Sequence, residues 1–300
     1  MSEQQNHALL FELLRSFTTL ADTLNLSRAV EKLSSTRQTV RRHISILEQI
    51  KGEALFEVED RQYHLTDAGR RSVREAEDIL ARGRAWINNE AGHIGGLYLI
   101  NRGGDGDWYY HLQQHPISNI WTSKSRLLKQ GIKCWAEAEG DIESPALEPI
   151  RPNLMVFRRL EGDWVCAKVG SESSYATWYG WRWELSAIGR KVPSLPGGTA
   201  LAHLLAQPFE EVRANHGLRY DHVFTQMHRG EDGNMEPISF KRLLMGCRFP
   251  DGSFALSSLV ERSHDLRIEG VSDAQIRLMP ENLVMDSIPA EEELGKDFSS

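Results

Sequence analysis

Residues 26–48 read LSRAVEKLSSTRQTVRRHISILE, and this stretch predicts two short helices joined by a tight turn. Apolar residues recur at helical spacing in the first helix and form one face of it: Leu26, Ala29, Val30 and Leu33. Ser34 interrupts that spacing. Thr36 has the short hydroxyl side chain that accepts a backbone hydrogen bond at a helix N-terminus. The second helix is therefore predicted to begin directly after Thr36.

The second helix has an apolar side and a polar side. Its apolar side is formed by Val40, Ile44 and Leu47, and its polar side by Arg37, Gln38, Arg41, Arg42 and Ser45. In the major groove of DNA, Arg can bond guanine bidentately and Gln can do the same with adenine. Hydroxyl groups near the start of this helix can bond phosphates: Ser35, Thr36 and Thr39. An ordinary solvated helix is the alternative, but the helix-turn-helix spacing favours a DNA-binding surface.

Basic charge is concentrated in the same part of the chain. The 300 residues carry a formal net charge of −7. Between Arg15 and Lys51, however, seven basic residues stand against three acidic ones, which leaves a local charge of +4. A DNA-binding domain needs a local basic face rather than a basic average.

The neighbouring segments complete a winged helix-turn-helix. A helix predicted over residues 8–22 has a broad apolar face made of Leu9, Leu10, Leu13, Leu14, Phe17 and Leu20. After Gly52, the segments ALFEV and QYHL predict a two-stranded wing around Glu59-Asp60-Arg61. Thr66 then begins a long helix, in which the residues spaced for a partner helix are Val73, Ala76, Leu80 and Ile87. This helix is predicted to be a dimerisation linker; the alternative is an ordinary core helix.

Residues 8 to about 87 resemble the N-terminal region of LysR-type transcriptional regulators. The family pattern is met at Leu26, Ala29, Leu33, Thr36, Ile44, Leu47, Glu48, Gly52, Leu55 and Phe56, and again at Leu65-Thr66-Asp67-Ala68-Gly69. The resemblance covers a little under a third of the chain. It implies binding to double-stranded DNA as a homodimer or homotetramer.

The chain departs from the family pattern at several positions that bear on DNA contact. Arg37-Gln38 stands where the family usually has Gln-Pro, and Arg41 where it has Ser. The wing is acidic, with Glu57, Glu59 and Asp60. Because acidic side chains repel phosphate, we expect weak anchoring by the wing and more reliance on Arg41 and Arg42.

The second half of the chain does not show the regular alternation of strands and helices that builds the usual effector domain of LysR-type regulators. Five strands are predicted instead, at 154–159, 163–169, 218–228, 238–249 and 253–261. Helices are predicted between the second and third strands, at 173–179, 184–188 and 199–215. The order of two strands, helices and three antiparallel strands resembles that of a PAS-like sensor domain. The expected fold is thus a mainly α winged helix-turn-helix with a long linker helix, followed by an α+β PAS-like domain with an antiparallel sheet.

These predictions divide the chain into five parts. We expect a winged helix-turn-helix domain at 8–66, a linker helix at 67–90, an aromatic-rich segment without assignment at 91–150, a PAS-like domain at 151–265 and a disordered acidic tail at 278–300. One further helix is predicted at 123–139.

The sequence offers one candidate ligand site and no catalytic or metal centre. Trp178, Trp181 and Trp183 could line a small-molecule pocket, and core packing is the alternative. His111 and His115 would share a helical face, but no third metal ligand accompanies them. No nucleophile with its base is visible, so we expect no enzyme activity and no cofactor.

Localisation follows from what the sequence lacks. The three cysteines lie far apart, which suits a reducing cytoplasm, and Cys247 is expected to be buried in a strand. No apolar run approaches the roughly 18 residues that span a bilayer, and the first residues lack signal-peptide features. We therefore expect a cytoplasmic protein without a membrane partner.

The predicted function is a sequence-specific DNA-binding transcriptional regulator of LysR type. Its C-terminal domain would sense a small-molecule effector or another signal, or support oligomerisation. The alternative is a protein–protein interaction module whose degenerate helix-turn-helix no longer binds DNA specifically.

Overall fold

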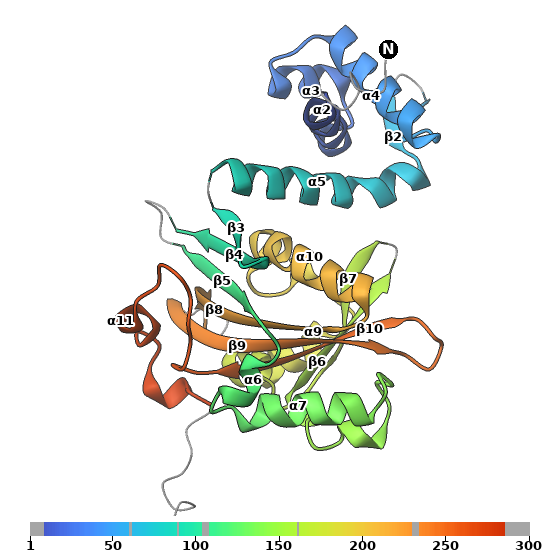
Figure 1. Ribbon diagram of the computed structural model, residues 1–300. Helices are drawn as coiled ribbons and strands as arrows, with labels where there is room; N and C mark the ends of the chain where they lie inside the picture. The colour runs from blue at the N-terminus through green and yellow to red at the C-terminus, as the bar shows by residue number, and fades with distance from the viewer. Residues whose placement is uncertain are drawn as a thin grey trace, which may run out of the picture. The chain divides into compact units, whose positions relative to one another are not determined.

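The structure, a computed structural model, describes residues 9–59, 62–88, 90–103, 108–160, 162–229 and 234–285. The chain forms two compact units, Met1–Asn88 and Asn89–Ser300, and each is described by itself (Figure 1). In the described part of the chain, no helix combines the length and apolarity needed to cross a membrane.

The N-terminal unit is a winged helix-turn-helix, as predicted. Its elements are α2 (Leu10–Thr23), α3 (Leu26–Leu33), α4 (Arg37–Lys51), β1 (Phe56–Glu59), β2 (Gln62–Leu65) and α5 (Asp67–Ile87). The wing strands β1 and β2 pair antiparallel, with Phe56 opposite Leu65. Asp60 and Arg61, expected at the tip of the wing, lie outside the described residues.

Polar side chains begin three of these helices. Thr36 accepts from the backbone N–H of Thr39 at 3.1 Å, which confirms it as the N-cap of α4. Asn25 does the same for α3, and Thr66 for α5. The turn between α3 and α4 needs Ser34 in the left-handed region, at φ 49°. These local preferences explain why a break of only three residues separates the two helices.

The expected inner face of α2 was too broad. Leu13, Leu14, Phe17 and Leu20 are buried, but Leu10 is 47% exposed. The helix begins only at Leu10. An apolar residue in the first turn therefore adds little to the core, because the rest of the domain does not cover it.

The linker helix α5 packs on its own domain through residues that the sequence had suggested for a partner helix. Ala76 and Leu80 are buried in one cluster with Phe17 of α2. Val73 is half-buried against the same cluster. Of the four residues named, only Ile87 stays largely exposed.

The C-terminal unit contains, within the described residues, one antiparallel sheet of eight strands. They are β3 (Ala91–Ile94), β4 (Leu97–Arg102), β5 (Tyr110–His115), β6 (Leu154–Leu160), β7 (Asp163–Val169), β8 (Leu218–His228), β9 (Met235–Arg248) and β10 (Phe254–Arg262). Their order across the sheet is β3-β4-β5-β8-β9-β10-β6-β7. The five strands predicted from the sequence are all present.

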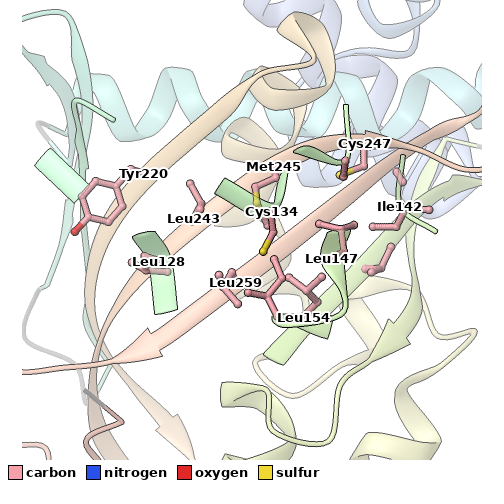
Figure 2. Close-up of a cluster of buried hydrophobic side chains, with 14 of the residues drawn as sticks. Leu128, Cys134, Ile142, Leu147, Leu154, Tyr220, Leu243, Met245, Cys247 and Leu259 are labelled. Carbon is pink, nitrogen blue, oxygen red and sulfur yellow. The ribbon is translucent and has the colours of Figure 1, made fainter. Parts of the chain in front are cut away.

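Helices cover both faces of this sheet, as Figure 1 shows for α7 (Arg126–Glu137) and α10 (Gly198–Asn215). On the α7 side, alternate residues of β9 pack with α7, among them Leu243, Met245 and Cys247 (Figure 2). Leu244, between them in sequence, packs with α10. Since both faces are covered, β9 is buried continuously over residues 238–247. Cys247 is buried at the end of a strand, as expected.

Shorter elements complete the C-terminal unit. They are α6 (Asn119–Thr122), the 3₁₀ turns at Pro145–Leu147 and Arg151–Asn153, α8 (Ser174–Tyr179), α9 (Trp181–Ala187), the 3₁₀ turn Val192–Ser194, α11 (Asp273–Ile276) and the 3₁₀ turn Glu281–Leu283. The helix expected at 123–139 is confirmed as the shorter α7.

Two expected boundaries are corrected by the sheet and its cover. The segment 91–150 is not separate from the domain expected at 151–265, because β5 pairs with β8 from Tyr110 opposite Thr225 onward. Residues 278–285 do not belong to the disordered acidic tail expected at 278–300, since Met279 and Leu283 are buried in the core. Residues 286–300 lie outside the described residues.

Candidate nucleic-acid interface and the C-terminal cavity

The outer face of α4 carries the predicted DNA-contacting residues. Thr36, Arg37, Gln38, Arg41, Arg42 and Ser45 are exposed, and Ser35 and Thr39 are half-buried. The opposite side of the helix is anchored by buried Val40, Ile44 and Leu47. This division between a buried and an exposed side fixes which side chains a partner of α4 can reach.

The start of α4 is tied to the start of α3. Arg37 donates from Nη2 to the Ser27 hydroxyl at 2.8 Å, and the hydroxyls of Thr36 and Thr39 are hydrogen-bonded at 2.9 Å. The side chains of Gln38 and Arg41 make no hydrogen bond or ion pair to any described residue. These two side chains can therefore turn to a partner without breaking such a bond within the protein.

A further cation lies near the start of α4. The Arg37–Ser27 bond joins the first turn of α3 to the start of α4. Arg28, which follows Ser27 in that turn, is exposed.

His43 joins α4 to α2 behind the exposed face. Its Nδ1 is hydrogen-bonded to the hydroxyl of buried Ser16 at 2.7 Å. Burial lowers the pKa of His43, and the charge of Arg42 acts in the same direction, against Glu12. The imidazole is therefore neutral at neutral pH and adds no charge to the basic face.

The wing is held against α4 by one carboxylate. Glu48 Oε1 accepts from the backbone N–H groups of Leu55 at 2.8 Å and Phe56 at 3.2 Å. Phe56 in turn packs edge-on against Phe17, with ring centroids 5.7 Å apart. On the exposed side of β1, Glu57 and Glu59 point away from this core. The wing therefore presents acidic side chains beside a basic helix.

The C-terminal unit holds a cavity of about 130 Å³ between the sheet and helices α8 and α10. Trp178 lines it and is buried. Trp181 is 67% exposed, and neither it nor Trp183 is among the lining residues. The cluster suggested by the sequence is thus not brought together, because Gly180 ends α8 and the other two tryptophans lie on α9, where Trp181 is exposed and Trp183 is half-buried away from the cavity lining.

A buried charge network lies under one end of this cavity. Asp221, which is fully buried, accepts from Arg219 Nε at 2.8 Å and from Arg242 Nη2 at 2.7 Å. Arg219 also donates to Glu211 of α10. Buried charges need such pairing to offset their desolvation. The two guanidinium groups and two carboxylates balance one another.

His111 and His115 lie on strand β5, not on a helix. His115 Nε2 donates to the carbonyl of Arg267, and His111 Nδ1 is hydrogen-bonded to Asn101. Each imidazole thus has its own structural partner. Among the described residues, no group of His, Cys, Asp and Glu is arranged to hold a metal ion.

Comparison with known proteins identifies a family for most of the N-terminal unit. Residues 11–70 match the family described as bacterial regulatory helix-turn-helix protein, lysR family. The chain is 38% identical over 83 residues to the HTH-type transcriptional activator AllS of Klebsiella pneumoniae. The matched stretch covers 28% of this chain and 29% of that protein. It is 39% identical over 78 residues to AllS of Salmonella typhimurium, 26% of this chain and 24% of that one. The chain thus spans less than a third of the length of these relatives.

Solved structures match about a quarter of this chain. Oxidized OxyR of Corynebacterium glutamicum is 25% identical and covers 26% of this chain and 26% of its own, with a TM-score of 0.26. The CbnR_DBD–DNA complex is 29% identical and covers 26% of this chain and 92% of its own, with a TM-score of 0.25. The N-terminal unit therefore carries a LysR-family helix-turn-helix domain on the evidence of its sequence match.

Proposed function

We propose that this protein is a DNA-binding transcriptional regulator of LysR type. The observation that carries the proposal is the face of α4, which exposes Arg, Gln and hydroxyl side chains within a segment that matches a bacterial regulatory helix-turn-helix. A helix of this kind fits the major groove. The relatives that share the segment are named as transcriptional activators.

The residues proposed to contact DNA divide into two groups. Gln38 would bond base edges, because its side chain is exposed and makes no hydrogen bond to the described part of the protein. Arg41, which is exposed in the same way, would bond a phosphate. Arg37 and Arg42 would bond phosphates, with the hydroxyls of Ser35, Thr36, Thr39 and Ser45. Arg28 extends the phosphate-binding group. The acidic wing would add little, since Glu57 and Glu59 repel phosphate.

A homodimer, or a tetramer built from dimers, is proposed to read a near-palindromic site. Ile79 and Trp86 of α5 are one heptad apart and are 44% and 72% exposed. Phe11 of α2 extends their apolar surface, because its ring packs beside Gly83 on the same side of α5. Burying this surface against a second copy would place two recognition helices on successive half-sites.

The C-terminal unit is proposed to be a PAS-like domain that senses a signal or supports oligomerisation. Support comes from the element order: β6 and β7, then α8, α9 and α10, then β8, β9 and β10. The cavity between the helices and the sheet gives such a domain a place for a small-molecule effector.

The test is selection of bound fragments from sheared genomic DNA by the purified protein at two salt concentrations. Enrichment of a short inverted repeat that persists at the higher salt supports the proposal. Uniform weak binding that disappears with salt would contradict it, because non-specific attraction alone has that salt dependence.

A protein–protein interaction module remains the second candidate, favoured by the acidic exposed side of β1. Retention on heparin separates the two. A regulator with an accessible basic face on α4 is retained and elutes in salt, whereas a module with that face covered passes through.

A further inference from the structure

The cavity of the C-terminal unit has mostly apolar walls. Its floor is the sheet, with Phe157, Ile238, Phe240 and Val260 among the lining residues. Its cover comes from α8, from the turn that precedes α10 and from α10 itself, including Trp178, Leu195, Leu201 and Phe209. Walls of this kind favour an apolar, planar ligand over a sugar or a phosphate compound.

Two hydroxyl groups at the cavity have no acceptor for their protons in the described structure. Tyr110 of β5 is 1% exposed, and the Arg242 guanidinium, itself a donor, lies against its buried hydroxyl. The hydroxyl of Tyr175 of α8 is buried without a hydrogen bond. Both residues line the cavity. The other hydroxyls of α8 are engaged, since Ser173 accepts from the Ala176 N–H and Ser174 accepts from Arg262. Buried polar groups are normally satisfied, so buried hydroxyls that lack an acceptor at a cavity indicate a missing polar partner.

The two hydroxyls are hydrogen-bond donors at neutral pH. Burial raises the pKa of Tyr110 to about 12 and raises that of Tyr175 as well. The charged residue that lines the cavity, Arg242, also only donates. A ligand beside Tyr110 and Arg242 must therefore offer an acceptor oxygen.

The charge of the site argues for an uncharged ligand. Arg242 already bonds Asp221, donating from Nε at 3.2 Å and from Nη2 at 2.7 Å. The second guanidinium on Asp221, that of Arg219, is balanced by Glu211. A ligand carboxylate would bring an unmatched charge into a buried site, which is costly.

The volume limits the ligand to one ring. The cavity measures about 130 Å³, and an apolar protein cavity of about 150 Å³ is known to bind benzene. We propose that this cavity binds an uncharged single-ring aromatic compound whose oxygen accepts a hydrogen bond from Tyr110. The use of this compound as a regulatory signal rests on the proposed function, whereas its binding to the cavity does not.

The test is a calorimetric titration of the full-length protein with phenol, toluene and benzoate. Phenol and toluene have the same shape, so their difference reports the oxygen. In Tyr110→Phe, phenol affinity should fall roughly tenfold, the size of one neutral hydrogen bond, while toluene affinity changes less than about twofold. Equal losses for the two compounds, or no binding of phenol and toluene to the unaltered protein, would overturn the proposal. Tighter binding of benzoate than of phenol would overturn the assignment of an uncharged ligand.

Tyr109→Phe is the matched control. The Tyr109 hydroxyl is also buried without a partner in the described structure, but the residue does not line the cavity. Its loss should leave phenol affinity unchanged. Tyr110→Phe keeps the ring and its packing, so the fold should persist, which circular dichroism checks. The titration contains no DNA, so its failure and a failure of DNA binding are separate results.

Discussion

Arg41 and Arg42 are neighbouring cations on the exposed face of α4. If both lie against DNA, each phosphate that they neutralise releases counterions. The affinity for DNA then falls more steeply as the salt concentration rises. In Arg41→Ala/Arg42→Ala we expect weaker binding to every sequence and a slope of log affinity against log salt that is flatter by up to about 1.8. Fluorescence anisotropy over a salt series measures both.

The control for this pair removes the same charge elsewhere. Arg126 and Lys133 are exposed on α7 of the C-terminal unit. Arg126→Ala/Lys133→Ala should keep the original slope. A slope that does not change in the α4 variant would remove these two arginines from the proposed interface.

Single residues also show where pattern and packing disagree. Thr36 was predicted as a cap from its type and position, and the contact with Thr39 confirms it. Trp181 was grouped with Trp178 from proximity in the sequence, but it faces solvent. A cap depends on three neighbouring residues, whereas a pocket wall depends on elements that are remote in the chain.

At the scale of elements, Glu48 links the recognition helix to the wing. Hydrogen bonds to a charged acceptor are each worth roughly 1.5–3 kcal/mol, and Glu48 receives two from the backbone. Glu48→Ala should therefore lower the stability of the N-terminal unit by at least about 1.5 kcal/mol. A domain of this size loses roughly 4–8 °C in Tm per kcal/mol.

Thermal unfolding followed by far-UV circular dichroism measures this change. Glu48→Gln keeps an acceptor oxygen without the charge, so it should lower the stability of the N-terminal unit by about half as much as Glu48→Ala. Glu57→Ala, on the exposed side of β1, should have no effect beyond about 0.5 kcal/mol. Equal losses in the Glu48 and Glu57 variants would show that the two bonds do not hold the wing.

Helix α5 is the element to which dimerisation is assigned. Carboxylates introduced in place of the exposed Ile79 and Trp86 would have to be desolvated in an interface. Ile79→Glu/Trp86→Glu should therefore give a monomer by light scattering at micromolar concentration, with at least a roughly tenfold loss of affinity for a palindromic site.

Arg84→Glu alters the net charge by the same amount at an exposed position on another side of α5. It should leave the oligomeric state unchanged. A dimer that survives the double substitution would place the interface elsewhere in the protein.

At the scale of the whole molecule, the C-terminal unit should depend on pH through a buried histidine. Burial lowers the pKa of His222 well below 6.5, and the neighbouring His115 and Lys241 act in the same direction. Its Nδ1 accepts from the Arg267 N–H at 2.9 Å, which only the neutral ring can do. The unfolded chain binds this proton more readily, so stability is full above about pH 6.5 and falls as the pH drops below it.

Denaturant unfolding at pH 7.5 and pH 5.5 tests this dependence. Tryptophan emission reports mainly the C-terminal unit, because seven of the eight tryptophans follow residue 89. His222→Asn keeps an acceptor near Nδ1 and should reduce the difference between the two pH values. His64→Asn, exposed on the wing, should not. An unchanged difference in His222→Asn would assign the effect to other groups.

The sequence by itself determined the elements of the N-terminal unit, the strands and main helices beyond residue 150, and the exposed face of α4. Amphipathic spacing decides which side of a single helix is buried, and caps decide where it begins, so both can be read from a few neighbouring residues. The five strands beyond residue 150 were found for the same reason, since alternation and turn residues are local.

Only the tertiary structure decided how remote segments share one sheet and one cavity. The segment 91–150 supplied no pattern strong enough to assign it, yet β5 pairs with β8, more than a hundred residues away. The same pairing brings Tyr110 to a cavity with Tyr175 and Arg242, although no motif connects the three. Which strands pair depends on long-range packing of buried surfaces, and that energy is not recorded in any short stretch of sequence.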